Sequence, residues 1–482
     1  MVMWPQTRGD RRGGVSEDDR QTPSSERVGD DPLAIGAADM RALGYWVVDC
    51  VVEHLERLPD EPAIVTATPA ELAARLGGPP PLDGGDPLAA METIVTVALA
   101  AMQHGDHPRY FARVPGPSSY PGVLGDWLAT GFNAIASSWV GGSGVSAVEL
   151  VALDWLRALL GLPEGAEGLM TSGGSLANLT ALAAARSAAG PGVCYLSDQA
   201  HASVVRALSV LGFATGDVRV LPTGADLRLS PADLSAAVAA DRSAGRRPGF
   251  VVATAGTTNT GAVDPLEELA GLCRAEGLWL HVDGAYGAAA ALCDEGRRHL
   301  GGLGLADSVV VDPHKWLFQP YDLGCVFVRS PGVLASAFRM TPEYLADATG
   351  GGEVDLRDRG PELTRRGRAL KMWLTFKVYG TRRLAAAVAR GIENAEHAQR
   401  LIETDPGWRV VTPAQLGIVT FAPLEAGDDT CRALAERVAR EGVAALTSTR
   451  LHGRPVLRLC AINPRTTPAD VALTLAALGV RV

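Results

Sequence analysis

Short, continuously apolar segments that alternate with Ala/Leu-rich stretches constrain the fold of this chain more than any other feature. Four such segments read as buried strands, at residues 193–197, 250–254, 279–282 and 308–311. A strand that is apolar on both faces belongs in a parallel sheet with helices on both sides. Because helical stretches separate these strands, the sequence predicts an α/β fold built on a mostly parallel central sheet.

The chain divides into four predicted parts around this sheet. Its start is rich in Arg, Asp, Gly and Ser and lacks the apolar stretch of a secretory signal, which is typical of disorder. A Pro/Gly-rich loop at residues 77–86 interrupts the helical segment that follows. The predicted parts are a disordered tail (1–31), an N-terminal helical segment (32–105), a large domain (106–375) and a small C-terminal α/β domain (376–482) with helices near 381–402 and up to 440 and strands at 417–421 and 456–461.

Composition excludes several classes of partner and site. A formal net charge of -10 and the lack of a basic stripe argue against nucleic acid. The seven cysteines are scattered and never spaced as C-x-x-C, so we expect no disulfides, no metal site and a reducing, cytoplasmic location. The apolar run at residues 94–102 is too short to cross a bilayer, so we expect no membrane partner and predict a buried helix there.

Polar side chains follow each predicted strand at the point where the strand ends. In an open α/β sheet, ligands bind beyond the carboxyl ends of the strands. The sequence therefore predicts a site at this edge of the sheet. The residues that it places there are His201, Thr257, Thr258, Asp283, His314 and Lys315.

A Gly-rich segment at residues 171–179 opens a stretch of nearly unbroken Ala and Leu. Glycine lets the backbone approach a ligand closely, and the free N–H groups at a helix N-terminus attract anions. We interpret Gly174 and Ser175 as part of a phosphate cradle. The alternative is an ordinary helix N-cap.

Lys315 is one of only three lysines, with Lys371 and Lys377, among 44 basic residues. A chain that otherwise uses arginine keeps lysine where an amine must lose its proton and attack a carbonyl. We expect burial at the strand end to lower the pKa of Lys315. The alternatives are a surface lysine and, for Lys371 and Lys377, leftovers of a coding bias.

Asp283 ends an apolar strand, where a carboxylate needs a cationic or hydrogen-bonding partner. The pyridinium nitrogen of pyridoxal-5′-phosphate (PLP) is one such partner, whereas a helix cap or a structural salt bridge is the ordinary one. The ring of His201 is placed to stack on the cofactor or to donate to a carboxylate, although a buried core histidine is more common. The order of cradle, His, Thr-Thr, Asp and Lys favours a PLP site.

The chain resembles the group II PLP-dependent decarboxylases, the family of aromatic-L-amino-acid, histidine and glutamate decarboxylases. The resemblance implies a type I PLP fold with a seven-stranded sheet, working as a homodimer whose active site is shared between subunits. The matching segments are 107–108, 118–121, 171–186, 197–201, 256–258, 281–283, 313–316 and 368–373.

Residue roles carry over from the family position by position. Lys315 then bonds to the cofactor aldehyde, Asp283 pairs with the pyridine nitrogen and His201 stacks on the ring. Gly174, Ser175 and His314 approach the phosphate, and Thr258 contacts the ring side. Tyr344 matches the loop tyrosine that returns a proton to the substrate Cα, where relatives that form aldehydes often carry Phe. The following stretch, 350–359, is predicted to be a flexible lid.

The substrate residues depart from those of the animal aromatic decarboxylases. Arg113 and Ser137 replace two aromatic residues and Thr364 replaces a glycine, which predicts a more polar pocket. Arg357 is a candidate for the substrate carboxylate, and Asp312, which replaces Asn, is left out of the cofactor set. The resemblance implies a carboxy-lyase of amino-acid metabolism that converts an L-amino acid, aromatic or related, to its amine. An aldehyde synthase or aminotransferase-type reaction is the alternative, and a non-catalytic scaffold is a further one.

Overall fold

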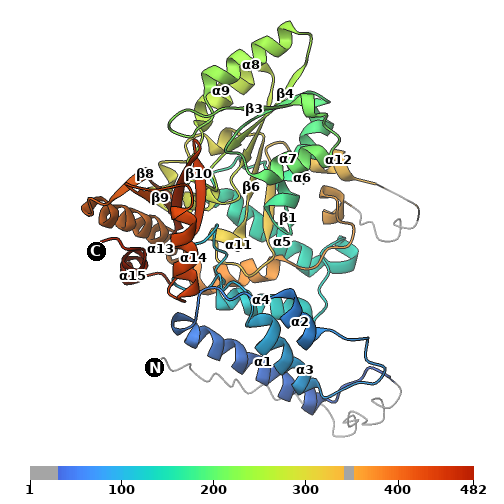
Figure 1. Cartoon of the computed structure of the whole chain (residues 1–482). Helices are drawn as coiled ribbons and strands as arrows, with labels where there is room; N and C mark the ends of the chain where they lie inside the picture. The colour runs from blue at the N-terminus through green and yellow to red at the C-terminus, as the bar shows by residue number, and fades with distance from the viewer. Residues whose placement is uncertain (1–30, 341–342, 344–351) are drawn as a thin grey trace.

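The structure, a computed structural model, describes residues 31–340, 343 and 352–482. The predicted tail up to residue 30, Tyr344 and the first residues of the predicted lid lie outside the described residues. Figure 1 shows an upper body that holds the sheets, with a layer of N-terminal helices beneath it.

A seven-stranded sheet forms the centre of the upper body, in the order β1-β7-β6-β5-β4-β2-β3. Neighbouring strands from β6 to β3 pair in parallel, whereas β7 pairs antiparallel with both β1 and β6. The prediction of a mostly parallel α/β sheet is therefore confirmed. The strands are β1 (Glu167–Thr171), β2 (Val193–Ser197), β3 (Val218–Leu221), β4 (Pro248–Thr254), β5 (Trp279–Asp283), β6 (Ser308–Val311) and β7 (Gly324–Val328).

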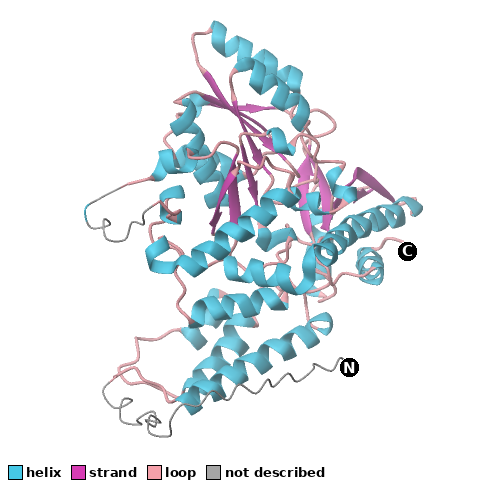
Figure 2. Ribbon diagram, turned by 180° about the vertical axis from the view of Figure 1, so that it is seen from behind, coloured by secondary structure: helices cyan, strands magenta, loops and turns pink. Residues whose placement is uncertain are grey.

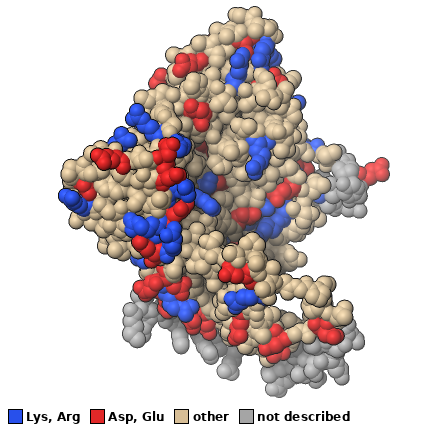
Figure 3. Space-filling model, viewed as in Figure 1, with Lys and Arg blue, Asp and Glu red and all other residues tan. Residues whose placement is uncertain are grey.

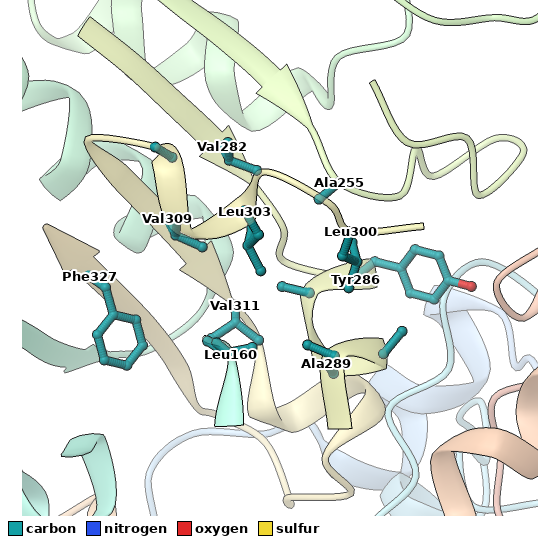
Figure 4. Close-up of a cluster of buried hydrophobic side chains, with 14 of the residues drawn as sticks. Leu160, Ala255, Val282, Tyr286, Ala289, Leu300, Leu303, Val309, Val311 and Phe327 are labelled. Carbon is teal, nitrogen blue, oxygen red and sulfur yellow. The ribbon is translucent and has the colours of Figure 1, made fainter. Parts of the chain in front are cut away.

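Helices cover both faces of this sheet (Figure 2). Successive residues of a strand point to opposite faces, and both faces are buried, which explains the continuous apolar runs. In β6, for example, Val309 and Val311 enter one apolar cluster while Val310 enters another on the face of α6. Figure 4 shows Val309 and Val311 beside Phe327 and Leu303 in the first cluster. The main helices of this domain are α4 (Tyr120–Gly131), α5 (Trp139–Leu159), α6 (Gly174–Ala189), α7 (Ala202–Val210), α8 (Pro231–Ser243), α9 (Leu266–Glu276) and α12 (Val333–Phe338), with the short α10 (Asp294–Arg297) and α11 (Pro313–Trp316).

The C-terminal part forms a four-stranded antiparallel sheet in the order β10-β11-β9-β8. Its helices and strands include the two helices and two strands that the sequence predicts there. The predicted boundary between residues 375 and 376 falls inside α13, close to the non-helical Gly380. The elements are α13 (Ala369–Thr404), β8 (Trp408–Gln415), β9 (Ile418–Pro423), α14 (Thr430–Arg440), β10 (Thr447–Leu451), β11 (Arg454–Cys460) and α15 (Pro468–Leu478).

The N-terminal helices are α1 (Ala37–Arg57), α2 (Pro69–Leu76) and α3 (Pro87–Thr93), followed by a π-helical turn at Ile94–Leu99. None of the residues of α1, α2 and α3 is buried. The apolar run at 94–102 is largely helical as predicted, but the prediction that it is buried is wrong. Val97 is buried, but Ile94 and Leu99 are 52% and 49% exposed. Within the described residues, no helix is long and apolar enough to span a bilayer.

Candidate active site

A cavity of about 450 Å³ lies at the carboxyl ends of the central strands. Thr254 and Asp283 are the last residues of β4 and β5, and Asp312 follows β6 directly. Figure 3 shows a hollow near the middle of one face, where basic and acidic side chains are intermixed. The cavity brings together all the predicted cofactor residues and one predicted substrate residue, namely Gly174, Ser175, His201, Thr258, Asp283, His314, Lys315 and Arg113.

The loop from β1 to α6 forms a backbone cradle at this cavity. Helix α6 begins at Gly174 with Gly173 as its N-cap residue, and no side chain among the described residues caps its N-terminus. A Cβ atom at Gly173 would lie 2.9 Å from Cε1 of His314, and one at Gly174 would lie 2.8 Å from Oδ2 of Asp312. Only glycine therefore permits this packing. The uncapped N–H groups and the helix dipole together suit an anion.

His314 presents a hydrogen-bond donor beside the cradle. Its Nδ1 accepts from the backbone N–H of Leu323 at 3.0 Å, so the neutral ring carries its proton on Nε2. Burial lowers the pKa of His314, although the Asp312 carboxylate partly offsets that effect. The neutral Nε2–H group can therefore donate to a phosphate oxygen.

Lys315 lies in α11 with its Nζ 2.8 Å from Oδ2 of Asp312. Burial alone would lower the pKa of this amine, but the charge and hydrogen bond of Asp312, together with the charge of Asp283, raise it overall. The prediction of a lowered pKa is wrong for this reason. Asp312, which the sequence reasoning set aside, is part of the site.

Asp283 is 5% exposed, and the two hydrogen bonds that it accepts within the described residues come from neutral groups. Its Oδ1 accepts from the N–H of Ala285 at 3.1 Å, and its Oδ2 accepts from Nδ2 of Asn178 at 3.0 Å. Because both donors are neutral amides, the carboxylate keeps its charge for a cation in the cavity. The alternative of a structural salt bridge does not match these contacts.

His201 is the N-cap of α7 and is exposed at the cavity in this chain, so it is not a buried core histidine. Its Nδ1 lies 2.8 Å from Oγ of Ser203. On the neighbouring wall, the carbonyl of Thr258 accepts from Nε of Arg458 at 2.6 Å. The buried Oγ1 of Thr254 also faces the cavity and has no hydrogen-bond partner within the described residues.

The donor set of the cavity fits PLP. The α6 N-terminus and Nε2–H of His314 suit the phosphate, the carboxylate of Asp283 suits the pyridine nitrogen and the amine of Lys315 suits the aldehyde. The unpartnered hydroxyl of Thr254 leaves a polar group for a ligand to satisfy. Asp312 is the one unusual feature, since it places a carboxylate beside the cradle.

The four predicted substrate residues do not lie together in this chain. Arg113 lines the cavity, with its Nη1 3.2 Å from Oε1 of Gln103. Ser137, Arg357 and Thr364 are all described and lie outside this cavity. The N–H of Arg357 donates to the carbonyl of Ser137 at 2.9 Å, and the Arg357 guanidinium lies 3.5 Å from the Asp355 carboxylate. Within one chain, therefore, the predicted substrate residues do not form a single pocket, since only Arg113 of the four lines the cavity.

Sequence reasoning missed three residues that shape the site. Arg458 is a buried cation in the otherwise mostly apolar β11, and it also donates to the carbonyl of Arg113. Asn178 is a buried amide in the Ala/Leu-rich α6. Lys371 is fully buried and is no leftover, because its Nζ contacts Asp126 and the carbonyls on either side of the cavity residue Tyr321. A buried polar residue in a mostly apolar element was the available signal for Arg458 and Asn178, and the scarcity of lysine was the signal for Lys371.

Comparison with known proteins decides the family. Residues 85–423 match the family model described as the pyridoxal-dependent decarboxylase conserved domain. The chain belongs to the pyridoxal-dependent decarboxylase family. It is similar to an aromatic-L-amino-acid decarboxylase of Bacillus atrophaeus, with 44% identity over 91% of this chain and 94% of that protein. This pyridoxal-dependent decarboxylase is therefore a PLP-dependent carboxy-lyase, and PLP is its cofactor.

Solved structures support the same fold. The pyridoxal-dependent decarboxylase is similar to rice (Oryza sativa) TDC with PLP and tryptamine, at a TM-score of 0.87 and 30% identity over 93% of this chain and 99% of that one. It is also similar to 4-hydroxyphenylacetaldehyde synthase of Rhodiola rosea, at a TM-score of 0.85 and 28% identity over 92% and 98% of the two chains. The expected type I PLP fold is confirmed.

Proposed function

We propose that this chain decarboxylates an aromatic L-amino acid to the amine and carbon dioxide, with PLP held on Lys315. One observation carries the proposal. The amine of Lys315, the carboxylate of Asp283, the ring of His201 and the uncapped N-terminus of α6 meet in one cavity of a pyridoxal-dependent decarboxylase. PLP supplies the electron sink for the electron pair that remains on the substrate Cα when the carboxylate leaves.

The residues of the chain supply binding, orientation and charge. Lys315 would hold the cofactor aldehyde, and the Asp283 carboxylate would keep the pyridine nitrogen protonated. Gly174, Ser175 and His314 would bind the phosphate, while Thr258 and His201 would contact the ring. His201 has only its Nε2 edge free to face a substrate, because Nδ1 is engaged by Ser203.

The substrate class follows from the relatives and the cavity wall. The similar proteins are named for aromatic substrates and products. Tyr110 offers an aromatic wall, and its hydroxyl donates to Oε1 of Gln103 at 2.6 Å, beside Arg113. This polar corner suits a ring substituent such as a hydroxyl, so we expect hydroxylated aromatic amino acids among the best substrates.

Tyr344 selects the amine outcome in this proposal by returning a proton to the substrate Cα. The second candidate function is aldehyde synthesis, which the likeness to a 4-hydroxyphenylacetaldehyde synthase favours. Product analysis separates the two, since decarboxylation gives carbon dioxide and amine, whereas the aldehyde route consumes dioxygen and water and gives aldehyde, carbon dioxide, ammonia and hydrogen peroxide. We expect amine from the unmodified enzyme and partial diversion to aldehyde in Tyr344→Phe. Aldehyde as the main product of the unmodified enzyme would reverse the choice.

We propose that two copies of the chain share their active sites in a cytoplasmic homodimer. Helices α1, α2 and α3 bury no residue within one chain, and the end of α4 exposes Leu128 and the C-cap residue Phe132, the latter at 82%. An apolar groove of about 470 Å³ runs beside these two residues. A second copy covering these surfaces would account for their exposure and would bring Ser137 and Arg357 to the other subunit's cavity.

Mixing two inactive variants tests the shared site. Lys315→Ala and Arg357→Gln each remove one contribution, and a mixed dimer rebuilds one intact site. Random exchange should restore about a quarter of the unmodified activity, because half of the dimers are mixed and half of their sites are intact. Recovery near zero, with exchange proven by mass spectrometry of the mixed dimers, would contradict sharing. The aromatic substrate itself is tested by carbon dioxide release from a panel of amino acids, with Lys315→Ala as the blank.

A further inference from the structure

A chain of buried hydrogen bonds runs behind the cavity from β5 to α7. It begins at Nε1 of Trp279, which lies 2.9 Å from Oγ of Ser308. The same hydroxyl lies 2.8 Å from Nδ1 of His281, and Nε2 of His281 lies 2.9 Å from Oδ1 of Asn178. The amide nitrogen of Asn178 then contacts Oδ2 of Asp283 at 3.0 Å and Oγ of Ser203 at 3.1 Å.

The sequence explains why these groups meet. Trp279, His281 and Asp283 alternate along β5, so their side chains share one face of the strand. That face meets α6, which presents Asn178 between the small residues Ala177 and Ala181. A series of polar side chains inside an apolar interface destabilises the protein unless each of its polar groups has a hydrogen-bond partner.

The groups at the two ends of this series of hydrogen bonds, Trp279 and Asp283, fix the direction in which each bond in the series is donated. An indole N–H only donates, so Oγ of Ser308 accepts from Nε1 of Trp279 and keeps its own proton available for Nδ1 of His281. The neutral His281 ring then carries its proton on Nε2 and donates to Asn178. At the other end a carboxylate only accepts, so the amide of Asn178 must point its NH₂ group toward Asp283. Burial lowers the pKa of His281 to about 4 despite the nearby Asp283 charge, which keeps this ring neutral.

The same series of hydrogen bonds continues through Ser203 to His201 at the cavity. Because Oγ of Ser203 accepts from Asn178, its proton is available for Nδ1 of His201, 2.8 Å away. The backbone N–H of Ser203 points at the same nitrogen from 3.2 Å. The backbone N–H of Ser203 makes Nδ1 an acceptor, which the Ser203 hydroxyl shares, so the neutral ring of His201 carries its proton on Nε2.

We propose that Asn178 and His281 are positioning residues, which, with Ser308 and Trp279, hold the Asp283 carboxylate and, through Oγ of Ser203, orient the ring of His201. The inference rests on the proposed function for the roles of Asp283 and His201 at the cofactor. It adds that these two groups are oriented by a shared source. A variant that breaks the relay at Asn178 disturbs both of them.

The first test reads the tautomer without cofactor or substrate. Nitrogen-15 NMR of the histidine rings should show His201 with the proton on Nε2, and Asn178→Leu should shift the Nδ1 signal, because Oγ of Ser203 loses its Asn178 donor. This arm does not depend on decarboxylase activity, so it separates a failure of the relay from a failure of the proposed function. An unchanged Nδ1 signal in Asn178→Leu would overturn the inference.

The second test uses kinetics of the PLP-loaded enzyme. Asn178→Leu and His281→Leu should lower kcat on the order of 10- to 100-fold, as changes to supporting partners of a reactive centre do, with a smaller change in KM. His281→Gln keeps a donor toward Asn178 and an acceptor toward Ser308, so it should recover kcat to within a few-fold of the unmodified enzyme. Equal damage from Gln and Leu would show that only packing matters and would overturn the proposal. Should the Leu variants fail to fold, Ser308→Ala removes one hydroxyl and must reproduce a smaller loss of kcat.

Discussion

Replacing Lys371 by Met should destabilise the protein and disturb the cavity together. The Nζ atom of Lys371 lies 3.1 Å from Oδ2 of Asp126 and 2.9 and 3.0 Å from the carbonyls of Pro320 and Asp322. Methionine keeps the length of the buried chain but removes all three contacts. The two carbonyls flank Tyr321, which lines the cavity, so the change reaches the site.

The expected loss of stability depends on which partners Asp126 keeps in Lys371→Met. Removing one partner of a buried ion pair costs about 3–5 kcal/mol. Because Arg366 also contacts Asp126, at 3.0 Å, the carboxylate keeps one cation and we expect the lower end, about 3 kcal/mol. With an unfolding entropy of roughly 1 kcal/mol/K for a chain of this length, the melting temperature should fall by about 3 °C.

The assay is thermal unfolding followed by circular dichroism, together with KM for the amino acid substrate. Lys377→Met is the matched control, since Lys377 lies exposed on the same helix and contacts only the Trp373 ring, at 5.6 Å. That variant should lose at most about 1 kcal/mol and keep its KM. Equal melting temperatures for the two variants would refute the reasoning about Lys371.

Two further predictions concern the cofactor cradle. Asp312 raises the pKa of the Lys315 amine, so Asp312→Asn should lower that pKa and enlarge the neutral, nucleophilic fraction at a given pH. The rate of reaction with pyridoxal, which lacks the phosphate, should then rise and its pH midpoint move down; an unchanged pH profile would contradict the assigned contact. Gly174→Ala places a Cβ 2.8 Å from Asp312 and 3.1 Å from Ala285, so a cost of about 1–3 kcal/mol should weaken PLP binding roughly 5- to 150-fold. Gly271→Ala in α9, with no atom within 4 Å of its added Cβ, should bind PLP normally, and equal losses in the two variants would count against the cradle.

The strands at the centre of the sheet could be predicted from the sequence because burial on both faces leaves a continuous apolar run. The run at 308–311 coincides with β6, and the run at 193–197 coincides with β2. The edge strand β3 was missed, since none of its residues is buried and its pattern is not continuous. Strand β1 carries Glu167 and Gly168, which break the same apolar signal.

The sequence could predict which residues gather at one cavity but not the contacts between them. Polar residues after strands located Asp283 and Lys315 because strand ends gather at one edge of a sheet. The ion pair between Lys315 and Asp312 was missed, since it depends on one helical turn of α11 bringing the two side chains together. The burial of Lys371 depends on contacts with α4 and the loop around Tyr321, which only tertiary structure reveals.

Borohydride reduction of the PLP-loaded enzyme, followed by peptide mapping, tests the central claim most directly. Reduction fixes the cofactor to the amine that holds it, and the chain has only three lysines to distinguish. The account predicts one label per chain, on Lys315, and no label in Lys315→Ala. A label on Lys371 or Lys377, or a labelled Lys315→Ala variant that still releases carbon dioxide at the unmodified rate, would contradict it.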